Sequence, residues 1–226
     1  MKMTLMNLFE NFDPSTKIGS LNWIMVMIPM FLIPSYFWII PSRMNMIFNK
    51  FINLIYSEFK TISTNKYQPN ILMFLSLMIF IMLLNLIGLM PYIFTLTSHM
   101  SFNLPLSLTI WFSVNYYSWM NYPIKTLSHL VPLNTPSMLM NFMVIIELVS
   151  NIIRPLTLAI RLMANLMAGH LLLTLLGTFI SNSSLIIMMF MLIIQNLLFI
   201  LEISMSFIQS YVFSILSILY FSEAKN

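Results

Sequence analysis

Two apolar runs near the end of the sequence, residues 137–180 and 184–222, constrain the fold more than any other feature. As helices rising 1.5 Å per residue, they would measure about 66 and about 58 Å, against a bilayer hydrocarbon core of about 30 Å. Upright helices of that length would carry apolar side chains far into water. We therefore expect a long helical hairpin that is steeply tilted, bent at Pro155 or nearly horizontal in a membrane.

The composition places the whole chain in a membrane. Of its 226 residues, 59% are hydrophobic and 7% are charged, whereas a typical soluble domain is about 25% charged. Only helices and closed barrels satisfy their backbone polar groups in lipid. The apolar runs are too long for barrel strands and lack their alternation. The sequence thus predicts an all-α membrane protein with the lipid bilayer as its surroundings.

Four further elements precede the hairpin, in what we expect to be a single membrane domain over residues 1–226. Three are shorter membrane helices, and the fourth is an amphipathic surface helix on the matrix side. The spans are predicted at 21–40, 70–96 and 103–122, and the surface helix at 42–66.

The 42–66 segment carries most of the net positive charge. Its apolar residues recur at three- and four-residue steps, a pattern typical of a helix lying on a membrane surface. A basic loop usually remains on the side of synthesis, which in a mitochondrion is the matrix. No aromatic interleaving or recognition helix accompanies the charge, so we expect no nucleic-acid binding. The basic residues are Arg43, Lys50, Lys60 and Lys66, opposed only by Glu58.

Residue usage points to the mitochondrion. The chain has 23 Met and no Cys, and Ala is scarce although small residues help membrane helices to pack. Coding bias in an animal mitochondrial genome accounts for this usage, so we expect a mitochondrially encoded protein of the inner membrane. The N-terminal segment has neither a signal-peptide core nor an Arg-rich presequence. Absent cysteine excludes disulfides and thiolate metal sites, and we expect no metal or cofactor.

Four charged residues lie inside the two long apolar runs: Glu147, Arg154, Arg161 and Glu202. Each costs about 2.5–3.5 kcal/mol near a bilayer centre, so they must face a wet cavity, one another or a partner protein. The first three are seven residues apart and share one stripe of a helix. Because this spacing corresponds to about 10.5 Å along the helix, we expect no direct salt bridge between them.

The second helix of the hairpin has its own polar stripe at Gln195, Glu202 and Gln209. If the hairpin turns at about Asn182, Arg161 falls opposite Ile203 and close to Glu202. The two polar stripes are therefore expected to converge.

These polar residues admit a structural and a functional interpretation. Cross-linking between helices remains open for Glu147 and for Arg154, which could also extend to the membrane surface. It suits Arg161 least, because a guanidinium cannot be discharged by losing a proton. His170 and Glu202 could form a satisfied core pair, but they are also the side-chain types best able to pass protons near neutral pH.

Three other polar positions receive no functional interpretation. His99 and His129 lie in predicted loops, and we assign them no role. The triplet that starts at Asn182 matches a glycosylation acceptor, but a tight turn between membrane helices makes the match a coincidence.

The chain resembles subunit a of the rotary ATP synthases, in its animal mitochondrial form. The resemblance covers essentially the whole length and is strongest in IELVSNIIRPLTLAIRLMANLMAGHLL, LEISMSFIQSYVFSILSILY and the opening NLFENFDPST. It implies a stator subunit, not catalytic alone, that couples proton translocation to ATP synthesis. It also implies a nearly horizontal hairpin packed against a rotating ring of c subunits, beside the peripheral stalk and other membrane subunits.

The resemblance implies roles for individual residues as well. Arg161 matches the family's essential arginine, Asn165 its neighbouring asparagine, and Gln209 the glutamine that faces the arginine. Arg161 would bind the ring carboxylate and prevent a direct proton leak between two half-channels.

The two half-channels would be lined by the remaining polar residues. His170 and Glu202 match the polar pair of the intermembrane-space half-channel, and Glu147 matches the acidic residue of the matrix half-channel. Arg154 has no fixed role in the family, in which glutamine is common at this position.

Two alternatives remain open at this point. One is a secondary transporter or a proton-pumping membrane subunit of another respiratory complex, although such proteins usually show internal repeats, broken helices or buried lysines. The other is a purely structural scaffold, which would not need Arg161.

Overall fold

A computed structural model describes residues 9, 12–15, 19–34, 40–63, 68–90, 93–131, 139–181 and 183–223. Every regular element in these ranges is a helix, which confirms the predicted all-α fold. The elements are the 3₁₀ helices η2 (Leu21–Met27) and η4 (Leu96–Ser98), and the α-helices α2 (Ile28–Leu32), α3 (Arg43–Ile62), α4 (Gln68–Gly88), α5 (Met100–Asn121), α6 (Pro123–His129), α7 (Met140–Ser181) and α8 (Leu185–Glu223).

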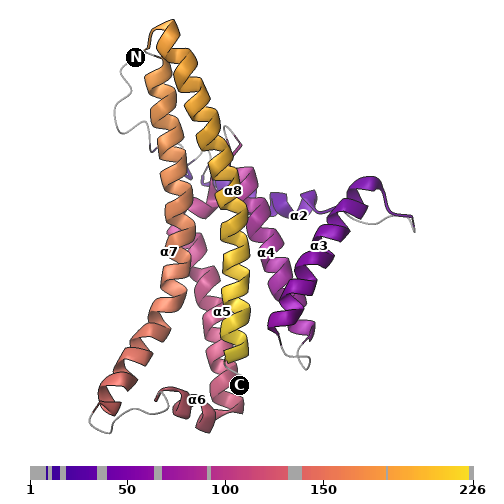
Figure 1. Cartoon of the computed structure of the whole chain (residues 1–226), viewed down its shortest axis with the longest axis vertical. Coiled ribbons are helices and arrows are strands. Elements are labelled where there is room, and N and C mark those ends of the chain that lie inside the picture. Colours follow the sequence, from indigo (N-terminus) through magenta and orange to yellow (C-terminus); the bar gives the residue numbers. More distant parts are fainter. Residues whose placement is uncertain are drawn as a thin grey trace.

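The two longest helices, α7 and α8, form the hairpin that the sequence predicts. They have 42 and 39 residues and begin and end within three residues of the predicted limits. Together with α4, they are long and apolar enough to cross a membrane. Figure 1 shows the two helices side by side near their connection and diverging toward the N-terminus of α7. Pro155 lies in α7, where it removes one backbone hydrogen bond and permits a bend.

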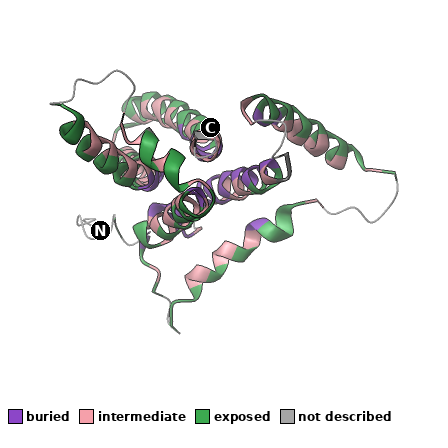
Figure 2. Cartoon of the chain, turned by 90° about the horizontal axis from the view of Figure 1, so that it is seen from below, coloured by how far each residue is buried: buried purple, intermediate pink, exposed green. Residues whose placement is uncertain are grey.

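Helix α4 packs antiparallel to α8, and the contact forms the centre of the molecule. Phe74, near the start of α4, lies 5.9 Å from Phe221, near the end of α8, between ring centroids. Two turns further along α4, Ile81 joins Phe213 of α8 and three leucines of α7 in one buried cluster. Figure 2 shows buried residues concentrated between the helices and exposed residues on their outer faces.

Helix α4 ends at Gly88, eight residues before the predicted end of the second span. Met90 precedes Pro91 in the sequence, and a residue before proline disfavours the helical conformation. The chain then makes turns and the short helix η4 before α5 begins. The Cγ2 atom of Thr95 lies 3.5 Å from the position that a Cβ atom would take at Gly88. The segment after α4 therefore folds back against the end of this helix.

The first predicted span is shorter in the structure. Helical structure continues from Leu21 to Leu32, and Ile33 is extended. Ile33 precedes Pro34, so the same pre-proline restriction accounts for the end of α2. Residues 35–39 of the predicted 21–40 span lie outside the described residues.

The amphipathic helix α3 starts at the N-cap Ser42, whose hydroxyl accepts a hydrogen bond from the backbone N–H of Asn45 at 3.4 Å. Its buried residues, Ile55 and Phe59, pack into the cluster shared by α4 and α8. The hydroxyl of Tyr211 on α8 donates a hydrogen bond to the Glu58 carboxylate at 2.8 Å. Helix α3 is thus attached to the hairpin, while Lys66, the last of its predicted basic residues, lies outside the described residues.

Candidate functional site

Arg161 lies at the midpoint of α7, on a face that the rest of the chain leaves uncovered. Leu158 and Leu162 are buried against α4 and α8, whereas Arg161 and Ala164 are exposed. Within the described ranges, Arg161 has no hydrogen-bond or ion-pair partner. A guanidinium keeps its charge at any physiological pH, and the described residues supply no counter-charge for it.

Arg154, one stripe position earlier on α7, forms an ion pair with Glu147. Its Nη2 atom lies 3.5 Å from Glu147 Oε1, and the two side chains are 32% and 34% exposed. The prediction that residues seven apart cannot form a salt bridge is therefore wrong. Side chains on a helix lean toward its N-terminus, so the long arginine side chain covers most of the distance to Glu147.

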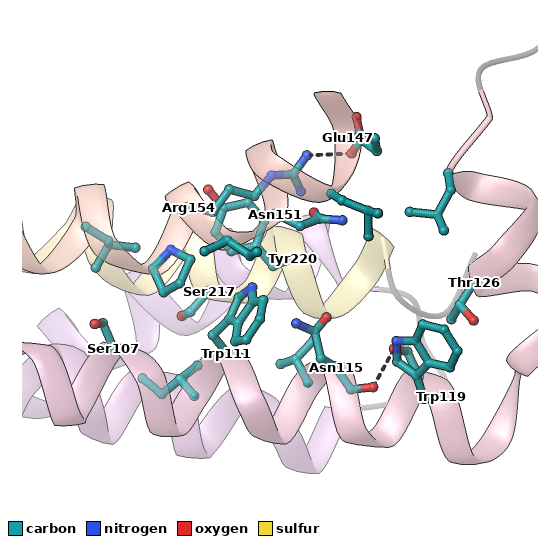
Figure 3. A pocket seen from close by; sticks show the side chains of 18 of the residues that line it. Ser107, Trp111, Asn115, Trp119, Thr126, Glu147, Asn151, Arg154, Ser217 and Tyr220 are labelled. Carbon is teal, nitrogen blue, oxygen red and sulfur yellow. Dashed lines mark hydrogen bonds and ion pairs between the residues drawn. The ribbon is translucent and has the colours of Figure 1, made fainter. Parts of the chain in front are cut away.

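Glu147 and Arg154 line a cavity of about 680 Å³ between α5, α6, α7 and α8 (Figure 3). The third charged residue on its wall is Lys125 of α6. The rest of the wall combines amide and hydroxyl groups with aromatic rings, among them Asn115, Trp119, Asn151, Ser217 and Tyr220. The cavity lies where α7 diverges from α8, and its wall is mainly apolar, with the charged, amide and hydroxyl groups set among apolar side chains.

A row of polar side chains is buried along one face of α8. Apart from the consecutive Gln209 and Ser210, they are three or four residues apart, which keeps them on a single side of the helix. The serines donate hydrogen bonds to backbone carbonyls three residues earlier, as Ser206 does to Ile203. The row comprises Glu202, Ser206, Gln209, Ser210, Ser214 and Ser217.

Glu202 begins this row and lies against Gly169 of α7. A Cβ atom added at Gly169 would overlap the Glu202 carboxylate, so any other residue there would require the Glu202 side chain to move. The Glu202 side chain is 9% exposed, and neither of its carboxylate oxygens has a hydrogen-bond partner among the described residues. Unpaired buried polar groups are rare in proteins, so the position of this carboxylate is unusual.

His170 is adjacent to Gly169 and lies at the junction of α7 and α4. Its ring lies near the backbone of Gly88 and 6.3 Å from the Phe12 ring, between centroids. Its Nε2 atom is buried and has no hydrogen-bond partner. The structure thus brings His170 and Glu202 to neighbouring positions without joining them by a hydrogen bond.

Asn165 and Gln209 join the two helices of the hairpin, since Asn165 Nδ2 donates to Gln209 Oε1 at 3.2 Å. This bond and the Gly169–Glu202 contact correct the predicted register. Arg161 lies one turn beyond Asn165, away from Glu202, and Ile203 is not its opposite residue. The prediction paired residues at equal distances from the turn at Asn182. The actual register of α7 against α8 depends on which side chains face the other helix, and residue counting does not take this into account.

Asn85 belongs to this polar region, although the sequence analysis did not single it out. Its side chain is 0% exposed, and both amide atoms lack hydrogen-bond partners. Asn85 lies one turn beyond Ile81 on α4, and Gln209 lies one turn before Phe213 on α8. Because these helices are antiparallel and Ile81 and Phe213 share one cluster, Asn85 and Gln209 lie at the same level. An amide side chain in the interior of the apolar 70–96 run was the available signal.

The remaining positions from the sequence analysis are structural or undescribed. His99 lies between two aromatic rings, with centroids 5.0 Å from Phe94 and 5.7 Å from Trp23. The His129 side chain and Asn182 lie outside the described part of the chain. Within that part, no group of three or more His, Cys, Asp or Glu could hold a metal ion.

Among the described residues, the site therefore has a cation without a partner, between two polar regions along α7. In comparison with known proteins, residues 19–222 match the ATP synthase A chain family. The chain belongs to this family. It is thus a membrane subunit of the ATP synthase complex, and its helices fit a multi-pass membrane protein.

Insect relatives agree with the assignment over the full length of the chain. It is 59% identical to ATP synthase subunit a of Apis mellifera ligustica over 227 residues, which cover both chains completely. It is 49% identical to the subunit of Locusta migratoria, over 96% of this chain and 98% of that one. For Drosophila melanogaster the identity is 46%, over 97% and 99%. Membership of this family favours the predicted resemblance to subunit a of the rotary ATP synthases over the two alternatives, a secondary transporter or proton pump and a structural scaffold.

Proposed function

We propose that this chain is the stator subunit that forms two proton half-channels against the rotating c-ring of mitochondrial ATP synthase. It couples proton translocation across the inner membrane to ATP synthesis and makes or breaks no covalent bond itself. Its partners are the c-ring, the peripheral stalk and the other membrane subunits.

The observation that carries this proposal is the environment of Arg161. A permanent cation at the middle of a membrane helix needs a counter-charge, because an isolated charge there costs about 2.5–3.5 kcal/mol. The described residues offer none, and the face around Arg161 is exposed and carries only uncharged neighbours, among them Thr157 and Ala164. A carboxylate on a partner that packs against this face meets the requirement, and a rotor ring brings such carboxylates past it in turn.

The two polar regions lie on opposite sides of Arg161 along α7. Glu147 precedes it by 14 residues and His170 follows it by nine, which correspond to about 21 and about 14 Å along a helix. Glu147 faces the cavity between α5 and α8. His170 and Glu202 belong to the buried region that also holds Asn85 and Gln209. Two separate passages would thus approach one cation from opposite ends.

The mechanism follows from the fact that the ring carboxylate can be ionised beside Arg161 but must be neutral in lipid. A proton entering along His170 and Glu202 neutralises a ring carboxylate, which then rotates into lipid without exposing an ion. After nearly a full turn the carboxylate meets the passage at Glu147, releases its proton and is attracted to Arg161. The guanidinium repels protons and so prevents a direct leak between the passages. Asn165 and Gln209, joined to each other, support the helix on which Arg161 lies.

Replacing Arg161 with Ala tests the proposal. The assembled complex carrying R161A should lose ATP-driven acidification of membrane vesicles, since nothing else would receive the ring carboxylate or separate the passages. Immunoblotting of the purified complex checks assembly. Normal acidification by a fully assembled R161A complex would refute the role.

A further inference from the structure

The ion pair between Arg154 and Glu147 differs from a structural cross-link, because both residues belong to α7. The Nη2–Oε1 distance is 3.5 Å, and both side chains lie on the cavity wall (Figure 3). A pair within one helix joins no two elements, so it contributes little to how the helices pack. The ion pair instead determines the position of the Glu147 carboxylate on the cavity wall.

Arg154 has a second contact that does not depend on Glu147. Its guanidinium carbon lies 5.1 Å from the centroid of the Tyr220 ring on α8, within the range of a cation–π interaction. The cation therefore keeps a favourable position whether or not Glu147 carries a negative charge. Release of Glu147 does not leave the guanidinium without a partner.

Lys125 is the other cation on the cavity wall, and its contacts differ. Its Nζ lies 5.7 Å from the centroid of the Tyr122 ring, and the ion pair that the described residues give Glu147 is the one with Arg154. Arg154 thus acts on the carboxylate by direct contact, whereas Lys125 contributes charge to the same space from α6. This difference offers a matched control.

We propose that Arg154 is a positioning residue for proton transfer at Glu147, an inference that rests on the proposed function of Glu147. In the resting arrangement the guanidinium holds the ionised carboxylate on the cavity wall. When a proton released by a ring carboxylate binds a Glu147 oxygen, the pair opens and Arg154 remains over Tyr220. When Glu147 gives that proton to water in the cavity, the pair forms again. One proton enters and one leaves, and Arg154 stays protonated throughout.

A double-mutant cycle in the assembled complex tests this inference. The measurement is the initial rate of ATP-driven vesicle acidification, normalised to the amount of assembled complex. R154Q should lower this rate about fivefold, the scale of coupling within one ion pair. In an E147Q background, R154Q should cause no further loss, because the group on which Arg154 acts is gone. R154K, which keeps the cation, should retain more than about half of the rate.

K125Q removes the same charge from the same cavity without touching the pair, so it should cause the same fold-change in both backgrounds. An equal fold-loss for R154Q with and without E147Q, or a wild-type rate for R154Q, would overturn the inference. If R154Q does not assemble, R154K decides: an assembled R154K complex with no proton transport also overturns it. A wild-type rate for E147Q alone would instead refute the proposed matrix passage.

Discussion

At the scale of single residues, the site depends on a buried carboxylate that has no hydrogen bond among the described residues and that packs very closely against a glycine. Glu202 is buried without a hydrogen bond, and it reaches that position because residue 169 has no side chain. Glycine inside a helix is normally unfavourable by about 0.5–1 kcal/mol relative to alanine. Its presence here is explained by the carboxylate that occupies the space of a Cβ atom.

Gly169→Ala should therefore displace the Glu202 side chain from its place against α7. Forcing a methyl group into a filled site costs about 1–3 kcal/mol, and we expect weaker thermal stability of the complex together with slower proton transport. Gly177, two turns further along α7, is the matched control, since nothing lies within 4 Å of a Cβ added there.

Gly177→Ala should leave transport unchanged and preserve or slightly raise stability. Thermal denaturation of the purified complex and vesicle acidification measure both effects. Equal behaviour of the two alanine variants would show that the Gly169–Glu202 contact is unimportant.

At the scale of elements, α3 is held to the hairpin by few interactions. Phe59 stacks on Tyr211 with centroids 6.4 Å apart, and the Tyr211 hydroxyl bonds to Glu58. Helix α3 also exposes the apolar side chains Met44, Ile47 and Leu54, which are suited to lipid. Its placement on the matrix surface stays a prediction.

Tyr211→Phe keeps the aromatic contact and removes only the hydroxyl. The loss of one hydrogen bond is worth about 0.5–1.5 kcal/mol, so backbone amides of Arg43–Ile62 should exchange hydrogen faster in the complex. Tyr116→Phe removes a hydroxyl from a tyrosine that is 66% exposed, and it should leave α3 exchange unaltered. If Tyr211→Phe exchanges like the wild-type complex, the hydroxyl does not secure α3.

The helical type of the elements and the lengths of the two longest helices were predictable because apolar runs act locally along the chain. Helices α2 and α4 end earlier than expected, and His129, expected in a loop, ends helix α6. The ends of α7 and α8, the amphipathic pattern of α3 and the stripe through Arg161 all follow from spacing. Three features were not predictable, because they depend on side-chain direction or on distant segments. These are the register of the hairpin, the Glu147–Arg154 pair and the burial of Asn85 against α8.

At the scale of the whole molecule, the chain leaves one long face of α7 uncovered around Arg161. Ala164 lies on this face, whereas Ala159 is fully buried on the other side of the helix. Small exposed residues let a neighbouring membrane helix approach closely. The uncovered face is therefore where we expect the rotor to pack.

Because the chain has no cysteine, single-cysteine variants can map this surface without further changes. Ala164→Cys carrying a photoreactive maleimide should cross-link to a ring subunit in the assembled complex, as detected by mass spectrometry. Ala159→Cys, treated in the same way, should give no adduct with the ring. Adducts only to lipid or to other subunits from position 164 would place the rotor elsewhere.

The divergence of α7 from α8 has a mechanical consequence. Pro155 removes a backbone hydrogen bond of α7 next to the cavity. Helix α8 contains neither proline nor glycine along its 39 residues. Under torque from a turning ring, bending would concentrate in α7 near Pro155, whereas α8 would stay straight and rigid beside it. The most compliant part of the subunit would then lie next to the proposed proton passage at Glu147, far from the connection between the helices.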